Sequence, residues 1–585
     1  MLNSHCRGRL CCSILWQLQY FRFGLNLFVV QCPSGIQWIR PASGLSQAEA
    51  EWVQGRKTVV GTALGEYLQR LQIEDFDVSQ YLSHMDNCNY DDVPIMGLAI
   101  SGGGWASAYT GTAAMRALDS ILDAAVQQRT GGLLQCITYM SGLSGGGFPT
   151  VSFAVNNFPT ADEIVEIWQP AINRFNTTNT KEYTTSFTDM FEDIGAKLEA
   201  GFPIGTADLF GRAWGYQFAP GYKGGLNVTL SSIVNESNFI HHQMPFPILQ
   251  KIELTDADVK LFGLEVPFAN DTTYDMTPFE FGAWGGSASS FMPTQYLGTK
   301  LNNGVHVNES ACVIESNGTL GSFSKSKRSL RKTMNGPRKR EEIIPPSEAT
   351  YAQIPNPFVG VPSASPYTQT APYLNMVDGS EGGQTIPLWG RIQPARASNF
   401  IIAWEDTNDA PPYGWNNGTN LYHTYQQASA DGLPFPIVPP LSTFIHQKWL
   451  TTTGDSRAPI VLYLAHAPYS AYLNFTADQG VMSPQQMDDI FLNGFNQVMQ
   501  GNGTLDHEWP ICLGCAAIER SLEKAGMYTP EQCRRCFEKY CWDGNSMDEK
   551  EVGIVNPTLV LDHKLGYLEW LAEHEYWNAT LSAQA

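Results

Sequence analysis

The stretch that decides the fold is residues 133–147, which read LLQCITYMSGLSGGG. Its first half, Leu133–Met140, is an apolar run whose length and composition are typical of a buried β-strand. Its second half holds four glycines around Ser144, and Pro149 then suits the first turn of a helix that begins at about Phe148. The stretch therefore predicts a strand, a glycine-rich turn that carries the serine, and a helix.

The same pattern occurs just upstream, and two further strands are expected downstream. Ile95–Ile100 is a short apolar run that ends in Ser101–Gly104, and residues 105–128 carry apolar side chains at helical spacing. Tyr373–Val377 and Asn399–Trp404 are apolar runs of strand length. Strands that alternate with helices indicate α/β architecture. We expect a central, mostly parallel sheet flanked by helices, with the serine on a nucleophile elbow between strand and helix.

Composition excludes several classes of protein. The chain has 585 residues, enough for one large α/β enzyme with insertions, and its 43% hydrophobic and 12% aromatic content excludes collagen, coiled coil and wholesale disorder. Its formal net charge of -21 would repel phosphate backbones, so nucleic acid is not an expected partner. Beyond the N-terminal region, no stretch approaches the roughly 18 apolar residues of a membrane span.

Sequons and the two chain ends point to the secretory route. Residues 1–31 are predicted to be a leader, because Arg7 and Arg9 suit a positive n-region and Ser13–Val30 is apolar, although interrupted. Residues 576–585 lack the hydrophobic tail of a glycolipid anchor signal. The sequence therefore predicts a secreted protein, extracellular or in the cell wall. Glycosylation is expected at ten Asn-x-Ser/Thr sequons: Asn176, Asn227, Asn235, Asn270, Asn308, Asn317, Asn417, Asn474, Asn502 and Asn578.

The cysteines allow two interpretations. Five of them lie within residues 505–545 in a C-x2-C and C-x2-C-x4-C pattern, whose spacing suits zinc but equally suits disulfides. The sequons favour an oxidising compartment, and therefore disulfides. The number outside the leader is odd, and Cys136, inside an apolar run, is expected to remain a buried free thiol. These cysteines are Cys32, Cys88, Cys136, Cys312, Cys512, Cys515, Cys533, Cys536 and Cys541.

Residues 321–342 differ abruptly from the rest of this acidic chain. They hold eight Lys and Arg residues in a Ser-rich setting. That composition is typical of a solvated, disordered loop, and its paired basic residues also suit a loop that is cut by secretory proteases. An untranslated segment retained in the gene model is a third interpretation.

The chemistry is carried by the two glycine-rich turns. Gly142–Gly146 fits the G-x-S-x-G pattern, in which glycines permit the strained turn that exposes the hydroxyl of a nucleophilic serine. An incidental serine in a glycine-rich turn is the alternative. Gly102–Gly104 precedes a helix, so its backbone N–H groups suit an oxyanion hole. A dinucleotide fingerprint would need glycine where Ser107 stands. The two turns together favour acyl transfer.

A nucleophilic serine also needs a base. Asp378 ends an apolar strand and is followed by small residues that let a second backbone approach closely. A strand-end turn aspartate is the alternative interpretation of this residue. The Ser, Asp, His order of α/β-hydrolases would require a downstream histidine, and none lies at a glycine-bracketed strand end. The histidines in question are His423, His446, His466, His507, His563 and His574.

Three blocks, in this order and spacing, resemble the signatures of the fungal phospholipase B, or lysophospholipase, family: Leu98–Gly104, Tyr139–Gly146 and Met376–Gly379. That family is related to the catalytic domain of cytosolic phospholipases. The resemblance runs from Cys32 through the Cys-rich region and covers most of the chain outside the leader and the basic insertion. It implies that residues 32–585 form a single lysophospholipase catalytic domain.

The resemblance also implies residue roles. Ser144 would be the nucleophile and Asp378 its partner in a Ser-Asp dyad, and the backbone of Gly102, Gly103 and Gly145 would form the oxyanion hole. The substrate would be a lysophospholipid or phospholipid at a membrane or micelle surface, and no metal or organic cofactor is implied. A carboxylate is a weak base unless desolvation raises its pKa, so a buried strand end suits the role of Asp378.

One position departs from the family pattern. The family has an arginine, thought to hold the substrate phosphate, where this chain has Ala106, and an alanine cannot bind a phosphate. Arg116 lies about three helical turns further on, too far to substitute. The absence of this arginine allows three interpretations: another cation binds the phosphate, the preferred substrate is a neutral ester, or the activity is reduced. A triad esterase or lipase and an inactive lipid-binding glycoprotein are therefore the rival interpretations.

Overall fold

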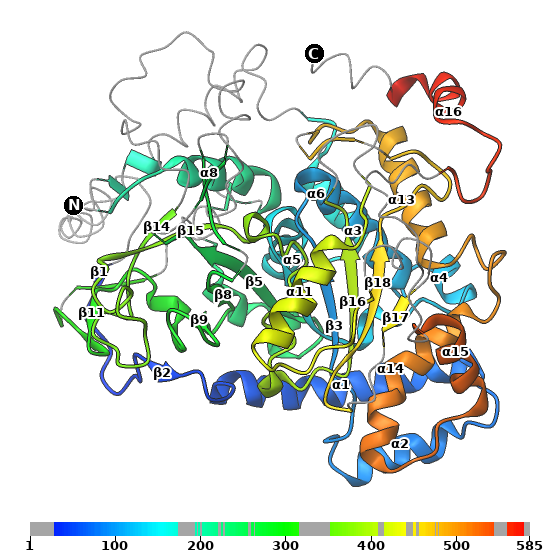
Figure 1. The fold of residues 1–585 in the computed structure, drawn as a ribbon, viewed down its shortest axis with the longest axis horizontal. Helices are drawn as coiled ribbons and strands as arrows, with labels where there is room; N and C mark the ends of the chain where they lie inside the picture. Colours follow the sequence, from blue (N-terminus) through cyan, green and yellow to red (C-terminus); the bar gives the residue numbers. More distant parts are fainter. Residues whose placement is uncertain are drawn as a thin grey trace, which may run out of the picture.

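The computed structural model describes most of the chain between Val29 and Trp577 (Figure 1). The leader up to residue 28 and the basic insertion at 321–342 lie outside the described residues. The described residues are 29–172, 193–195, 197–198, 202–219, 221, 224–225, 228–255, 259–261, 264–268, 270–309, 311–314, 352–407, 415–439, 449–451, 456–473, 475–477, 479–542 and 558–577.

A 12-stranded sheet forms the centre of the fold. Its middle strands β18, β16, β3, β4 and β5 run parallel, which confirms the predicted parallel core, and antiparallel strands extend it on both sides. In spatial order the strands are β17 (Trp449–Thr451), β18 (Ile460–Ala465), β16 (Phe400–Glu405), β3 (Met96–Ile100), β4 (Ile137–Gly142), β5 (Phe246–Glu253), β8 (Thr273–Met276), β9 (Glu280–Ala283), β10 (Ser290–Pro293) and β2 (Arg40–Pro41), with β14 (Ala352–Pro355) joined to β5 through β15 (Tyr373–Asp378).

Three two-stranded sheets complete the described β-structure: β1 (Val29–Val30) with β13 (Cys312–Val313), β11 (Leu301–Asn302) with β12 (Val305–His306), and β6 (Val259–Leu261) with β7 (Leu264–Val266).

Helices cover both faces of the sheet, and the side chains of its central strands alternate between two cores. Along β16, Phe400, Ile402 and Trp404 belong to the larger core, while Ile401 and Ala403 belong to the smaller core, which also contains Leu421 and Ala428 of α11. Helix α11 is labelled in Figure 1. This alternation is the period of two that a strand buried on both faces requires. The described helices are α1 (Gln47–Leu71), α2 (Val78–Asn87), α3 (Gly104–Leu118), α4 (Asp123–Gln127), α5 (Ser144–Val155), α6 (Ala161–Trp168), α8 (Thr206–Phe218), α9 (Ser237–Ile240), α11 (Thr419–Ala430), α13 (Pro484–Val498), α14 (Trp509–Ala525), α15 (Glu531–Tyr540) and α16 (Tyr567–Glu573).

Three element boundaries differ from the sequence prediction. The strand expected over Leu133–Met140 is shifted, because Leu134–Cys136 form a 3-10 helix and β4 runs from Ile137 to Gly142. The helix expected over 105–128 is two helices, α3 and α4, because the chain is extended at Asp119. Helix α5 begins at Ser144 instead of Phe148, so three glycines form its first turn despite their low helix propensity. A Cβ at Gly146 would lie 2.1 Å from the carbonyl oxygen of Ile100. Close packing of α5 on β3 therefore outweighs local propensity.

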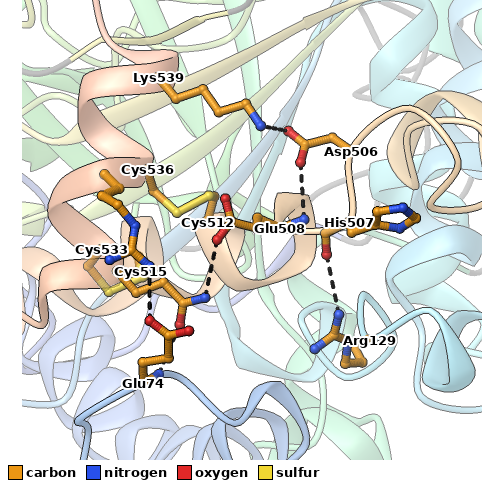
Figure 2. The surroundings of a disulfide bond; sticks show 12 residues. Glu74, Arg129, Asp506, His507, Glu508, Cys512, Cys515, Cys533, Cys536 and Lys539 are labelled. Carbon is orange, nitrogen blue, oxygen red and sulfur yellow. Dashed lines mark hydrogen bonds and ion pairs between the residues drawn. A yellow bond between two sulfur atoms is a disulfide. The ribbon is translucent and has the colours of Figure 1, made fainter.

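The C-terminal helices are joined by the predicted disulfides. Cys512–Cys536 and Cys515–Cys533 both link α14 to α15, and Lys539 on α15 pairs with Asp506 just before α14 (Figure 2). Because the sulfurs are consumed in these two bonds, the zinc interpretation of this pattern does not hold. A third disulfide joins Cys32 to Cys312. Cys136 is a buried thiol outside the disulfides, as predicted, and Cys88 and Cys541 are also outside them.

The described surface bears on two further predictions. Among the described helices, none combines the length and apolar character needed to cross a bilayer. Four sequon asparagines, Asn235, Asn270, Asn308 and Asn502, are exposed, and Asn417 is half-buried. The remaining sequons, at Asn176, Asn227, Asn317, Asn474 and Asn578, lie outside the described residues.

A buried ion cluster ties α1 to the antiparallel side of the sheet. The Arg396 guanidinium contacts Glu49 of α1 at 2.8 Å and Asp275 of β8 at 2.5 Å, and all three side chains are almost fully buried. The Tyr139 hydroxyl of β4 donates a hydrogen bond to the same Glu49 carboxylate. Breaking a buried pair leaves an uncompensated charge, which is strongly destabilising.

We therefore expect Arg396→Met to lower the free energy of unfolding by about 3–5 kcal/mol, because it leaves two buried carboxylates without their cation. Arg534→Met, which removes an exposed pair with Glu531, is the matched control and should cost less than about 1 kcal/mol. Denaturant titrations of both variants measure the difference. Equal midpoints for the two variants would contradict this account of the cluster.

Candidate active site

Ser144 lies at the elbow between β4 and α5. It is the first residue of the helix, its side chain is largely buried, and its φ of 47° is in the left-handed region. That conformation is strained for a residue with a side chain and is characteristic of a nucleophile elbow. Gly145 permits the turn, since a Cβ there would lie 2.1 Å from the carbonyl oxygen of Gly104. The elbow on which the predicted nucleophile stands is confirmed.

Strand β5 sets the position of Asp378 relative to this elbow. β4 pairs with β5 up to Gly142 opposite Leu249, and β15 pairs with β5 down to Asp378 opposite Lys251. The other edge of β5 is occupied by β8 over the same residues, so β4 and β15 share one edge. The C-terminal ends of β4 and β15 therefore point at each other. Their last paired residues lie opposite Leu249 and Lys251, which are only two positions apart on β5. At a rise of about 3.3 Å per residue, this register brings the Asp378 strand end next to the serine elbow.

The carboxylate of Asp378 is buried and oriented by the turn that follows it. The backbone N–H and the hydroxyl of Ser380 both donate hydrogen bonds to its Oδ1, at 3.0 and 2.9 Å. A Cβ at Gly102 would lie 2.8 Å from Cβ of Ser380 and 3.1 Å from Cβ of Ser144. The two predicted catalytic segments and the glycine turn after β3 thus meet around Gly102, where any side chain would intrude.

The glycine turn after β3 is fixed by two backbone contacts. The N–H of Gly102 donates to the carbonyl of Thr385 at 2.8 Å, so this predicted oxyanion donor is already satisfied. The Ser101 hydroxyl accepts from the Asp406 N–H at 2.9 Å and donates to the Gly102 carbonyl at 2.8 Å. Among the described residues, the amides of Gly103 and Gly145 have no acceptor outside their own helices. Of the three predicted oxyanion donors, Gly103 and Gly145 are therefore the two whose N–H groups are not engaged in this way.

The histidines downstream of Asp378 differ in whether they lie near the Asp378 turn. His423 contacts the Asp378 turn, with Nδ1 2.9 Å from the carbonyl of Gly383, and does not bond to Asp378 itself. His466 is fully buried, and burial lowers its pKa even though Asp406 opposes this. Its Nδ1 bonds to Asp406 and its Nε2 to Asn493, so neither nitrogen faces Ser144.

The other histidines are away from this turn or cannot be placed. His507 and His563 are exposed, and His574 stacks on Trp570. His446 lies outside the described residues. Of the described histidines, His423 is therefore the one that a triad would have to use.

The position at which the sequence pattern expects an arginine is occupied by Ala106, and Arg116 does not take its place. Ala106 on α3 is buried among core residues and offers no charge. Arg116 pairs with Asp162 of α6 and lies over the Phe491 ring of α13, so it faces away from the elbow, as the sequence predicted. A roughly 730 Å³ groove also lies on that side, lined by α3, α6 and α13 and not by Ser144.

Sequence reasoning missed three residues that shape the site: Ser101, Ser380 and Glu381. The first two are ordinary turn residues, and only their hydrogen bonds show their role. Glu381 is half-buried beside Asp378, and burial, reinforced by the Asp378 charge, raises the pKa of Glu381 to about 8. The sequence does show an acidic residue, Glu381, three positions after the predicted base Asp378, but it does not show that Glu381 is buried.

The raised pKa of Glu381 predicts how stability depends on pH. Between its ordinary value of 4.5 and about 8, the folded chain holds this proton and the unfolded chain releases it, so stability falls as pH rises through this window. Glu381→Gln should match wild type near pH 4.5 and exceed it by about 1 kcal/mol or more at pH 8. Denaturant titrations across this range, with the exposed Glu51→Gln as control, measure the effect. Parallel curves for wild type and Glu381→Gln would contradict it.

Comparison with known proteins places this geometry in a family. The sequence profile of the lysophospholipase catalytic domain matches residues 96–547. Lysophospholipase 1 of Aspergillus fumigatus is 32% identical over 580 residues, covering 92% of this chain and 90% of its own. The lysophospholipase of Arthroderma benhamiae is 33% identical, covering 91% and 87% of the two chains. Probable lysophospholipase 5 of Schizosaccharomyces pombe is 31% identical, covering 88% and 87%.

Solved structures agree at the level of the fold. Human GIVD cytosolic phospholipase A2 superposes with a TM-score of 0.59 at 17% identity, covering 84% of this chain and 69% of its own. The likeness shows that the two chains share the α/β fold. With the profile match over most of its length and these relatives, the chain belongs to the lysophospholipase family that its three sequence blocks resemble.

Proposed function

We propose that this protein is a serine lipid hydrolase that releases fatty acids from lysophospholipids through a dyad of Ser144 and Asp378. The observation that carries the proposal is the meeting of the β4 elbow and the β15 end on one edge of β5. Membership of the lysophospholipase family supports the substrate class. Diacyl phospholipids are a second substrate class that the same chemistry would accept.

The reaction would proceed through an acyl-enzyme. The Ser144 hydroxyl attacks the ester carbonyl while its proton passes to the Asp378 carboxylate, and the amides of Gly103 and Gly145 bind the oxyanion. The proton then passes to the leaving glycerophospho-alcohol as the acyl bond breaks. A water molecule, deprotonated by Asp378, attacks the acyl-enzyme, and the fatty acid leaves as Ser144 regains its proton.

The surroundings of the elbow suit an acyl chain. Trp105 directly follows the glycine turn and Phe148 lies one helical turn after Ser144, and both rings pack on Phe218 of α8 at centroid distances of 5.1 and 4.4 Å. Such an apolar wall favours a fatty acyl group over a polar one. It also excludes water, which strengthens the hydrogen bonds to a developing oxyanion.

The head group is the point at which this chain differs from the family pattern. Because Ala106 provides no charge, we infer that the acyl ester contributes more to recognition than the phosphate does. Turnover of neutral monoacylglycerol beside lysophosphatidylcholine measures this directly. A large preference for lysophosphatidylcholine would mean that another cation binds the phosphate.

We also propose that the protein is secreted and N-glycosylated. Exposed sequon asparagines and three disulfides support this location, since disulfides persist in oxidising compartments. Glycosidase digestion of the protein from its native culture, followed by mass measurement, tests it. An unglycosylated protein that is retained inside the cell would contradict it.

The dyad predicts a clear division among variants. Ser144→Ala and Asp378→Asn should each lower lysophosphatidylcholine hydrolysis by at least about 1,000-fold, because each removes one member of a unit that acts together. His423→Ala should stay within about threefold of wild type, since a dyad needs no imidazole. Fatty-acid release is measured for each variant, with circular dichroism to show that the fold is retained.

Results that differ from these expectations would each favour a different alternative to the dyad. Loss of activity in His423→Ala as severe as in Ser144→Ala would replace the dyad with a triad. Wild type without measurable fatty-acid release would favour the inactive lipid-binding glycoprotein. Unchanged activity in Asp378→Asn would remove the proposed base.

A further inference from the structure

Three side chains that commonly bind metals meet at the C-terminal end of α2, outside the active site. The Nε2 of His84, the Sγ of Cys88 and a carboxylate oxygen of Asp92 all lie within 4.8 Å of one another. His84 Nε2 is 2.9 Å from Asp92 Oδ2. All three residues are half-buried, so the group is both sheltered and open to solvent.

The local sequence builds this group by regular spacing. His84 and Cys88 are four residues apart, which places them on the same side of α2 and its C-cap. Asn89 and Tyr90 both have positive φ, at 52° and 62°, and turn the chain sharply after the helix. This turn returns Asp92, four residues beyond Cys88, to the side of the helix that carries His84.

Helix α14 holds Asp92 in place from the other side. Lys524 Nζ bonds to Asp92 Oδ1 at 2.9 Å, and the Ser521 hydroxyl donates to the backbone carbonyl of Asp92 at 2.6 Å. The carboxylate is thereby oriented with Oδ2 toward His84.

We propose that His84, Cys88 and Asp92 form a zinc site with a fourth position for water. One thiolate sulfur, one imidazole nitrogen and one carboxylate oxygen are ligands that Zn²⁺ accepts together, whereas Ca²⁺ and Mg²⁺ prefer oxygen alone. Binding releases the Cys88 thiol proton, and His84 exchanges its Nε2 proton with solvent for one on Nδ1, so that Nε2 and the Asp92 carboxylate exchange their mutual hydrogen bond for two bonds to the metal. Nitrogen and oxygen ligands of a tetrahedral zinc are roughly 3.3–3.4 Å apart, so His84 Nε2 and Asp92 Oδ2 move slightly apart from their present 2.9 Å.

Two lysines lie near the group, Lys524 and Lys57. Lys57 Nζ bonds to the backbone carbonyl of Asp91 at 3.0 Å and acts electrostatically on Asp92 and Cys88. The ligand set itself balances a divalent cation. Zinc adds two positive charges, and the Cys88 thiolate and the Asp92 carboxylate supply two negative ones. Lys524 remains on Asp92 Oδ1 and on the carbonyl of Asp91, where it neutralises neither the sulfur nor the imidazole. An outer partner that holds the second oxygen of a ligating carboxylate is a normal feature of metal sites.

Such a site would cross-link neighbouring segments of the chain. It would join the end of α2 to the segment that leads into β3, and through Lys524 and Ser521 to α14, which carries two disulfides to α15. The ligand therefore contributes to stability and leaves the Ser144 chemistry untouched. The site is independent of the proposed hydrolase function, and its test needs no activity measurement.

The first experiment uses Co²⁺ as a spectroscopic probe of the full-length protein. We expect wild type to show a thiolate-to-cobalt charge-transfer absorption that saturates at one equivalent and is displaced by Zn²⁺. Cys88→Ser should lose this absorption, and Cys541→Ser, which changes another half-buried cysteine outside the disulfides, should keep it. No absorption in wild type, or absorption that persists in Cys88→Ser, would overturn the proposal.

The second experiment measures thermal unfolding with and without Zn²⁺. Saturating zinc should raise the midpoint of wild type by about 3 °C or more, because it binds only the folded chain. Asp92→Asn should lose this shift, while Asp91→Asn, which removes the same charge from the neighbouring residue, should keep it. Equal zinc shifts in the two variants would show that zinc acts elsewhere and would contradict the assignment.

Discussion

The structure depends on how two strands share one edge of β5. Most strands in a sheet have one neighbour on each side, but β5 has β8 on one side and both β4 and β15, end to end, on the other. One of these strands is parallel to β5 and the other antiparallel, so both C-terminal ends converge on the same point. A hydroxyl and a carboxylate that are 234 positions apart in sequence numbering, Ser144 and Asp378, are placed there by backbone pairing alone.

Glycine makes this convergence sterically possible. Cβ atoms at Gly145 or Gly146 would collide with the backbone of the turn after β3, and one at Gly102 would crowd Ser144 and Ser380. These contacts explain why Gly145 and Gly146 follow Ser144 in the first turn of α5 despite their low helix propensity. The amides of Gly103 and Gly145, on which the proposed oxyanion hole rests, belong to these closely packed turns.

Local patterns made part of this architecture predictable, and long-range contacts account for what was not. The strands at 95–100, 373–377 and 399–404 were readable because buried strands are short apolar runs between turn residues. The start of α5 was misplaced because tertiary packing of glycines decides it. The engagement of the Gly102 amide by Thr385, and the orientation of Asp378 by Ser380, are not expressed in sequence spacing at all. The family resemblance was carried by the three blocks that converge at the site, which is why it identified the family from so few residues.

The account stands on the claim that Asp378 activates Ser144. The most direct measurement is intact-protein mass spectrometry after exposure to a fluorophosphonate, which reacts only with activated serines. The account predicts a single adduct, mapped to Ser144 by peptide digestion, that forms rapidly in wild type and at least about 100-fold more slowly in Asp378→Asn. An adduct on another serine, or equal labelling rates in the two proteins, would contradict it.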